Sequence, residues 1–264
     1  MSINKKFPVH NALVENASIY CATIAISPNF TQDLYASRES DVYDSATVTF
    51  FKYEGKFYGV TCWHVVEILQ EAERTNGKGT HSFHTMLNGF YTIGNRFYQP
   101  TAKFGQPRPD IAIREVLGDF INHLGKTPID VENIVAPSEV PDFAYAVGFP
   151  TKLKYSKEVR EDFINKKQVV MPHIQVLAEI TNQNIKQRFT MHSESTEDLD
   201  VKSFSGTSGG PIFWSNNDEY GLIGIIYESI TGTMLASDKT IHISAECANK
   251  DEVIRWITEY EAQK

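Results

Sequence analysis

The chain has 264 residues, of which 41% are hydrophobic and 22% are charged, and 25 Lys and Arg against 33 Asp and Glu give a formal net charge of −8. A chain of this length can bury about three quarters of its surface, so it can form one large domain or two small lobes. The negative charge and the lack of a Lys/Arg cluster argue against binding to nucleic acid or to an anionic membrane.

The first forty residues show no export or membrane signal. The apolar run at residues 19–26 is separated from Lys5 and Lys6 by polar residues, whereas a secretory signal places its positive charges directly against its apolar segment. No stretch reaches the eighteen apolar residues of a membrane span. The three cysteines are too few and too scattered for a disulfide framework: Cys21, Cys62 and Cys247. We therefore expect a cytoplasmic protein.

Short β-branched or aromatic runs between Gly and Pro residues predict a mostly β chain. The predicted strands cover residues 17–26, 47–51, 56–60, 90–93, 96–99, 111–116, 143–147, 169–180, 211–214, 222–227 and 240–243, and the second and third form a hairpin that turns at Gly55. Helical periodicity occurs at residues 65–74, more weakly at 157–166, and at the end of the chain. The turn-rich residues 125–141 are the predicted crossover between two β lobes.

The C-terminal segment carries the clearest helix signal. Asn249 can cap the helix, and Glu252 stands three residues later, as in a capping box. The apolar residues that follow share one face: Val253, Trp256, Ile257 and Tyr260. We expect this face to dock on the body of the protein.

The most informative stretch is residues 205–213, Ser-Gly-Thr-Ser-Gly-Gly-Pro-Ile-Phe, in which small residues surround Ser208. Acyl transfer needs backbone N–H groups that converge on the oxygen that becomes negative, and Gly206 can supply one with little steric demand. Gly209 and Gly210 let the chain leave the loop in conformations that other residues avoid. Alone, such a pattern is also typical of an ordinary turn.

A serine nucleophile needs a base, and His64 is the best candidate among eight histidines. It ends a predicted strand and opens a helical pattern, so its side chain projects from a rigid element. Asp110 begins the apolar run 110–113 and could hold the second nitrogen of that imidazole. The alternatives are a hydrogen-bonded structural histidine and a strand-start aspartate that binds its own backbone.

Three blocks together resemble the catalytic blocks of trypsin-like (chymotrypsin-fold) serine peptidases, in the same His, Asp, Ser order. They are residues 60–64 (Val-Thr-Cys-Trp-His), 110–113 (Asp-Ile-Ala-Ile) and 206–211 (Gly-Thr-Ser-Gly-Gly-Pro). Residues 144–150 (Ala-Tyr-Ala-Val-Gly-Phe-Pro) resemble a strand of bacterial members, and 221–226 resemble the strand that lines the substrate cleft. The resemblance covers about residues 45–230 and indicates a bacterial, intracellular type.

The resemblance implies an all-β fold of two antiparallel, six-stranded β-barrels with a C-terminal helix. Residues 1–125 would form the lobe that carries His64 and Asp110, and residues 126–264 the lobe that carries Ser208. The implied activity is a serine endopeptidase that hydrolyses a polypeptide substrate through an acyl-enzyme. Ser208 would be the nucleophile, His64 the base and Asp110 its orienting partner, and the N–H groups of Gly206 and Ser208 would form the oxyanion hole. No cofactor and no metal ion are implied.

Two positions depart from that family. Thr207 stands where digestive members carry an Asp that pairs with a new N-terminus, so activation by proteolytic trimming is not expected, and control by a regulatory protein partner or a mobile loop stays open. Trp63 replaces a small alanine beside the histidine.

Substrate preference is less determined. Lys202 would floor the specificity pocket and favour an acidic side chain, although it can equally point into solvent. The other expected substrate-binding residues are Ser203, Tyr227 and Ser229.

Three other interpretations remain. The pattern around Ser208 also satisfies the G-x-S-x-G signature of α/β-hydrolase esterases, but Gly209, Gly210 and Pro211 oppose the helix which that fold requires. A protease-fold peptide-binding module without catalytic activity is the main alternative. Metal binding by His81 and His84 has no clear third ligand.

Overall fold

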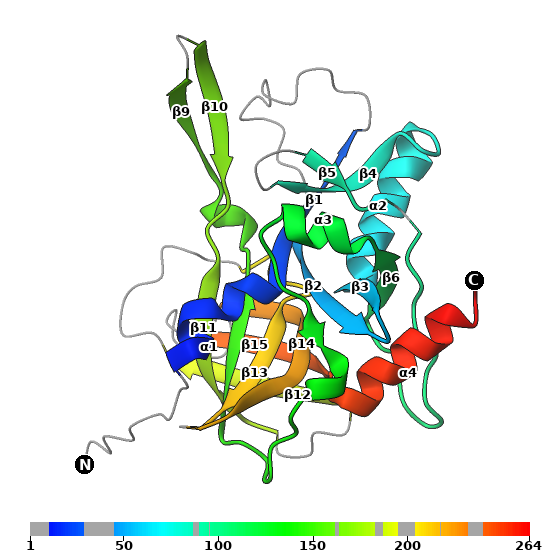
Figure 1. The fold of residues 1–264 in the computed structure, drawn as a ribbon, viewed down its shortest axis with the longest axis vertical. Coiled ribbons are helices and arrows are strands. Elements are labelled where there is room, and N and C mark those ends of the chain that lie inside the picture. The colour runs from blue at the N-terminus through cyan, green and yellow to red at the C-terminus, as the bar shows by residue number, and fades with distance from the viewer. Residues whose placement is uncertain are drawn as a thin grey trace.

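The protein is described from a computed structural model that covers residues 11–28, 45–86, 90–94, 96–161, 164–182, 187–194, 204–216, 218–231 and 240–264. Within these residues the chain is mostly β and forms a seven-stranded sheet, a closed barrel and a separate two-stranded arm (Figure 1). The fold class expected from the sequence, an all-β chain with two barrel-like β units and a C-terminal helix, is confirmed.

The first β unit is a sheet with the strand order β5-β4-β1-β2-β3-β6. Its strands are β1 (Cys21–Pro28), β2 (Ser45–Tyr53), β3 (Lys56–Thr61), β4 (His81–Met86), β5 (Phe90–Thr92) and β6 (Ala112–Val116), and β7 (Ile129–Asp130) pairs in parallel with β2. The predicted hairpin joins β2 to β3. Its turn residues Glu54 and Gly55 have φ of 48° and 77°, and two positive φ values match a type I′ turn, which follows the twist of the strands.

The second β unit is a barrel closed in the order β11-β12-β15-β14-β13-β8. Its strands are β8 (Phe143–Gly148), β11 (Ile174–Ile180), β12 (Arg188–Glu194), β13 (Pro211–Ser215), β14 (Tyr220–Thr231) and β15 (Thr240–Cys247). Alternate residues of these strands fill the interior, among them Phe189, Ile212, Trp214 and Ile243. Closure removes the unpaired edges that an open sheet would leave.

The helices cover the outside of the two β units. They are α1 (Asn11–Asn16), η1 (Ala17–Tyr20), α2 (Trp63–Asn76), α3 (Gly118–His123), η2 (Val131–Asn133), η3 (Thr151–Leu153) and α4 (Lys250–Glu261). Asn249 caps α4, since its side chain accepts a hydrogen bond from Glu252 N at 3.0 Å, as predicted. Trp256 of α4 belongs to one apolar cluster with Phe51 of the sheet and Phe213 of the barrel. The two β units and α4 therefore share a core.

The arm consists of β9 (Tyr155–Glu161) and β10 (Ile164–Val170), which pair only with each other among the described strands. It projects away from the barrel in Figure 1. The helix predicted at 157–166 is therefore wrong, because both flanks of that segment are strands. The strand predicted at 169–180 is also divided: β10 ends at Val170 and β11 begins at Ile174. Pro172 lies in the break, and it has no N–H to give to a ladder.

Two other boundaries differ from the prediction. Residues 17–20 form the 3-10 helix η1, so the first strand starts only at Cys21. Residues 96–99 form no strand, and Tyr98 makes one isolated bridge to Ile113. The lobe boundary placed at residues 125 and 126 stays a prediction. No helix within the described ranges is both long enough and apolar enough to cross a membrane.

Candidate functional site

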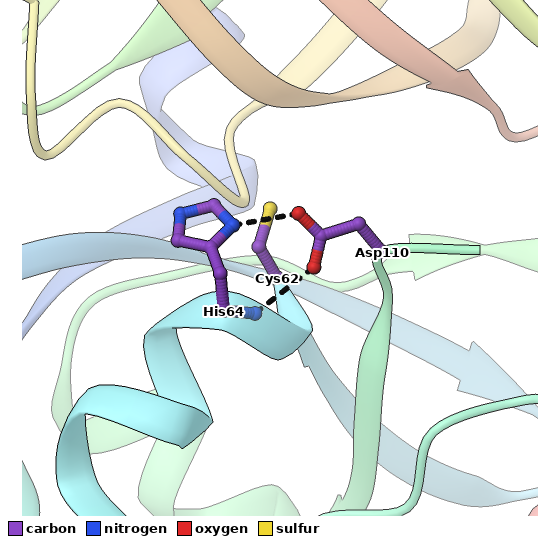
Figure 2. A group of neighbouring side chains, drawn as sticks. All are labelled: Cys62, His64 and Asp110. Carbon is purple, nitrogen blue, oxygen red and sulfur yellow. Dashed lines mark hydrogen bonds and ion pairs between the residues drawn. The ribbon is translucent and has the colours of Figure 1, made fainter. Parts of the chain in front are cut away.

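His64 and Asp110 are neighbours because the strands before and after them pair. β3 ends at Thr61, which pairs with Ala112 of β6, so the start of α2 and the start of β6 lie side by side. His64 Nδ1 lies 2.6 Å from Asp110 Oδ2, and the backbone N–H of His64 donates to Asp110 Oδ1 at 2.9 Å (Figure 2). Two contacts to one carboxylate fix both the imidazole and the first turn of the helix.

The carboxylate of Asp110 is held in its ionised form. Burial by itself raises the pKa of Asp110, but hydrogen bonds from the His64 ring and from the backbone N–H groups of His64 and Trp63 together lower it below its ordinary value. An ionised carboxylate only accepts hydrogen bonds, so Nδ1 carries a proton toward it. The neutral imidazole is then left with Nε2 as its free acceptor.

The loop that carries Ser208 needs glycine at two positions. Thr207 N donates to Phe204 O at 3.1 Å, and Gly206 has φ of +101° at the third position of this turn, which is the type II geometry. A Cβ on Gly206 would lie 2.6 Å from Phe149 O. Gly209 has φ of +92°, and a Cβ there would lie 2.0 Å from Thr47 O. Other residues would therefore displace the loop.

The carbonyl groups of two peptide units in this loop accept hydrogen bonds from neighbouring backbone N–H groups. Ser205 O accepts from Thr151 N at 2.8 Å, and Thr207 O accepts from Gly210 N at 2.9 Å. In a trans peptide the N–H points opposite to the C=O. The N–H groups of Gly206 and Ser208 therefore point away from these partners, and neither of them donates a hydrogen bond to the described part of the chain.

Strand β2 holds the same loop from the other β unit through two threonines. Thr47 N donates to Ser208 O at 2.9 Å, and Thr47 Oγ1 donates to Gly206 O at 2.9 Å. Thr49 Oγ1 donates to Gly209 O at 2.7 Å. Both threonine side chains are fully buried. We call Thr47 and Thr49 the threonine clamp.

Ser208 faces the cleft that His64 and Asp110 also line. Its hydroxyl donates to Tyr227 O at 3.2 Å, and among the described residues it forms no hydrogen bond with His64. The cleft has a volume of about 390 Å³, and its lining comprises His64, Asp110, Phe204, Ser205, Ser208, Tyr227, Glu228, Ser229 and Ile230. The structure thus brings together five side chains singled out from the sequence.

The remaining sequence expectations have different outcomes. Lys202 and Ser203 lie outside the described residues. Thr207 is buried, and its hydroxyl bonds Phe204 O at 2.9 Å and the hydroxyl of Ser229. Trp63 finds room on the apolar cluster of the first sheet. The serine is followed by β13 rather than by a helix, so the α/β-hydrolase interpretation is wrong.

Three side chains could be considered for a metal ion, since donor atoms of Cys62, His64 and Asp110 lie within 4.8 Å of one another (Figure 2). Their chemistry does not suit one. The Cys62 thiol donates to Ile226 O at 3.0 Å, and burial, followed by the carboxylates of Asp110 and Glu246, raises the pKa of this thiol well above its ordinary value. Nδ1 and Oδ2 are engaged with each other. The trio therefore does not suit a metal ion, and only His64 and Asp110 are arranged to share a proton.

The earlier metal candidates do not converge. His81 and His84 stand three residues apart on β4, so their side chains leave opposite faces of the strand. Nδ1 of His81 contacts the hydroxyl of Thr80 at 2.9 Å, and Nδ1 of His84 contacts that of Thr92 at 3.1 Å.

Sequence reasoning missed the threonine clamp and Glu246, whose carboxylate accepts from Asp110 N at 2.8 Å. A threonine in a strand is ordinary and gives no signal. Glu246 did carry one: it is an acid inside the continuous strand β15, where its neighbours are buried.

No protein-family model matches the chain, and no curated protein matches it significantly. Among solved structures, the thermostable serine protease AL20 from an extremophilic microorganism is 12% identical, with a TM-score of 0.46, over 92% of this chain and 98% of that chain. Protease Anisep from Arthrobacter nicotinovorans is 13% identical, with a TM-score of 0.41, over 85% and 88%. A structure from a study of the Sesbania mosaic virus VPg protein is 11% identical, with a TM-score of 0.40, over 85% of each chain.

Proposed function

We propose that this protein is a serine endopeptidase of the trypsin-like type, with Ser208 as nucleophile, His64 as general base and Asp110 as the residue that orients it. The observation that carries the proposal is the 2.6 Å contact between His64 Nδ1 and Asp110 Oδ2 in the cleft that Ser208 also lines. An imidazole held in this tautomer can accept a proton at Nε2, which is what activation of a serine hydroxyl requires.

The proposed reaction begins when the Ser208 hydroxyl leaves Tyr227 O and turns to His64 Nε2. Its oxygen attacks the scissile carbonyl carbon while His64 takes the proton, and the imidazolium is stabilised by Asp110. The N–H groups of Gly206 and Ser208 bind the oxygen that becomes negative. His64 then gives its proton to the leaving amine. Water, activated by the same imidazole, hydrolyses the acyl-enzyme and frees Ser208.

The contacts of Thr207 support the proposal that the enzyme is active without proteolytic trimming. Its hydroxyl is bonded within the loop, to Phe204 O and to Ser229. The loop is also held by carbonyl contacts from Thr47, Thr49 and Thr151, none of which involves a chain end. A charged partner for position 207 is therefore unnecessary.

The finer parts of the proposal follow from the sequence. The substrate is a polypeptide, and Tyr227 and Ser229 of β14 contact it. Lys202 favours an acidic side chain in the substrate. The proposed peptidase acts in the cytoplasm of a bacterium and uses no metal and no cofactor. It binds neither nucleic acid nor membrane, and a protein partner can control it.

A second candidate is a protease-fold module that binds peptides without cleaving them. One observation favours it: the Ser208 hydroxyl is bonded to Tyr227 O and not to His64. Both side chains line the same cleft, and catalytic hydrogen bonds are often long or poorly aligned before substrate binds, so this bond does not decide against catalysis. The endopeptidase therefore remains the proposal.

A fluorophosphonate probe separates the two functions. The endopeptidase predicts covalent labelling of Ser208, loss of labelling in Ser208→Ala, and strong suppression in His64→Ala. Ser215→Ala, at the far end of β13, is the control and should label like the wild type. Folded wild-type protein that stays unlabelled would favour the binding module.

The substrate is found with a diverse peptide mixture and mass spectrometry, with Ser208→Ala as the blank. Products that form only with the wild type identify the cleaved bond and the preferred side chain. If an acidic side chain precedes the cleaved bond, Lys202→Ala should reduce that preference. Cleavage that is unaffected by Lys202→Ala would remove Lys202 from the pocket.

A further inference from the structure

An ion pair with a buried carboxylate and a partly exposed guanidinium lies directly behind Asp110. Glu246 of β15 has a residue exposure of 1%, and its Oε1 accepts from the backbone N–H of Asp110 at 2.8 Å. The same oxygen accepts from Arg188 Nε at 2.8 Å and lies 2.7 Å from Arg188 Nη2. Arg188 and Glu246 are also cross-strand partners of β12 and β15. The second β unit therefore binds the backbone of Asp110, which lies two residues before β6 of the first unit.

Arg188 also contacts Tyr227, a residue that lines the cleft. Its guanidinium carbon lies 4.9 Å from the ring centre of Tyr227, a cation–π distance. The carbonyl of the same tyrosine accepts the Ser208 hydroxyl. Arg188 thus contacts both Glu246, which binds Asp110, and Tyr227 of β14, which binds Ser208.

We propose that Arg188 and Glu246 form a positioning pair that fixes the backbone of Asp110 and keeps the net charge behind the His64–Asp110 dyad at zero. This inference rests on the proposed function, in which the dyad exchanges a proton with Ser208. Neither residue touches the reacting atoms. An ion pair whose carboxylate is buried is weak support for stability alone, because apolar replacements of buried charges are often as stable. A role in positioning Asp110 explains why the Arg188–Glu246 pair lies beside its backbone.

The charges around the dyad make the role measurable. The charged and titratable groups that face it in the described residues are Cys62 between β3 and α2, Glu246 of β15, Arg188 of β12, and Tyr227 and Glu228 of β14. Arg108 contributes its carbonyl to Arg188, while its own guanidinium binds Gln99 O and Pro100 O. Burial raises the pKa of Glu246 although Arg188 and Asp110 N both bind it, so its charge depends on these partners.

Glu246→Gln keeps an acceptor for Asp110 N but leaves the positive charge of Arg188 uncompensated. A positive charge opposes formation of the imidazolium, so the His64 ring should titrate at lower pH, by roughly 0.5 pH unit at the effective dielectric of a partly exposed site. Arg188→Met/Glu246→Gln removes both charges, so the midpoint should return toward the wild-type value. A purely structural role would make the double variant at least as disturbed as the single one.

The test is an NMR titration of the His64 ring in the full chain, with the signal identified by its loss in His64→Ala. Glu252→Gln is the matched control, because Glu252 is also buried and pairs with Arg255, but on α4. It should leave the His64 midpoint unchanged. Should Glu246→Gln fail to fold, Arg188→Lys/Glu246→Gln keeps the positive charge, and the same direction of shift is expected.

A midpoint in Glu246→Gln equal to the wild type, or an equal shift in the double variant, would overturn the positioning role. The titration measures the His64 ring without turnover, so its result does not depend on whether the protein is an active peptidase. Fluorophosphonate labelling of the wild type tests that function separately. If labelling occurs, the acid limb of its pH–rate profile should move in the same direction as the NMR midpoint.

Discussion

Replacing Thr47 by Val removes one hydroxyl from the threonine clamp. That hydroxyl donates to Gly206 O at 2.9 Å and accepts from Phe149 N at 3.1 Å, and the residue has no exposed surface. Thr47→Val therefore leaves a buried carbonyl and a buried N–H without partners. The backbone N–H of Thr47, which donates to Ser208 O, is retained.

The magnitudes follow from these two groups. A buried polar group that loses its partner costs about 1–3 kcal/mol, so Thr47→Val, which leaves two such groups, should lower the free energy of unfolding by about 2–6 kcal/mol. Loss of one oxyanion donor costs about 10²- to 10³-fold in rate. The substitution loosens the peptide next to the Gly206 N–H without deleting it, so we expect a decrease of about 10- to 100-fold.

The assay is the rate of fluorophosphonate labelling, because phosphonylation also develops a negative oxygen and needs no known substrate. Thr49→Val is the matched control: it is equally buried, lies on the same strand and loses one bond to Gly209 O, away from the proposed donors. It should cost about 1–3 kcal/mol in stability and leave labelling within about threefold. Thr47→Ser keeps the hydroxyl and should label like the wild type. Equal labelling by folded Thr47→Val and wild type would refute the role of the Thr47 hydroxyl.

Asp110→Asn should lower the labelling rate by about 10⁴-fold with the fold intact, because the amide favours the wrong imidazole tautomer; a rate within tenfold of the wild type would contradict this. Because the pKa of Asp110 is lowered in the folded protein, its carboxylate stabilises the fold at pH values above the ordinary pKa of an aspartate, and this stabilisation is lost as pH falls through the lowered value. The free energy of unfolding, measured in urea, should therefore decrease below about pH 4, and the decrease should be smaller in Asp110→Asn. Gly206→Ala should lose labelling and about 1–3 kcal/mol of stability, measured by urea unfolding, because its φ is +101° and its Cβ would meet backbone. Dialysis against EDTA should leave labelling unchanged, because Cys62 is protonated and His64 is engaged by Asp110; loss in EDTA and recovery with Zn²⁺ would show a metal site.

Local signals in the sequence predicted much of the fold. The hairpin turn at Gly55 and the cap at Asn249 depend on neighbouring residues, and both are confirmed. The segment at 157–166 misled, because its mixed polar pattern lacks the alternation with a period of two that is typical of a half-buried strand. Strands β4 and β12 were missed, and each has one partner close in the chain, β5 or β11, and one more distant partner, β1 or β15.

The residues of the candidate site likewise fall into those that local sequence signals indicated and those that they did not. His64, Asp110 and Ser208 were found because each stands in a recognisable block, and the structure places all three on one cleft. The clamp of Thr47 and Thr49 could not be found, because its partners are backbone carbonyl groups about 160 residues away. A backbone acceptor leaves no mark on the sequence, so a hydroxyl that reaches it looks like any other strand residue.

The unrecognised contacts are what join the two β units at the site. Each unit supplies a part: the sheet carries His64 and Asp110, and the barrel carries Ser208. The clamp holds the barrel's loop from the sheet, while Glu246 of the barrel holds the backbone of Asp110 in the sheet. These bonds run in opposite directions across one interface, so a shift of either unit would strain both. The relative placement of His64 and Ser208 is thus set by buried polar contacts, whose loss is costly, together with the apolar core that the two units share.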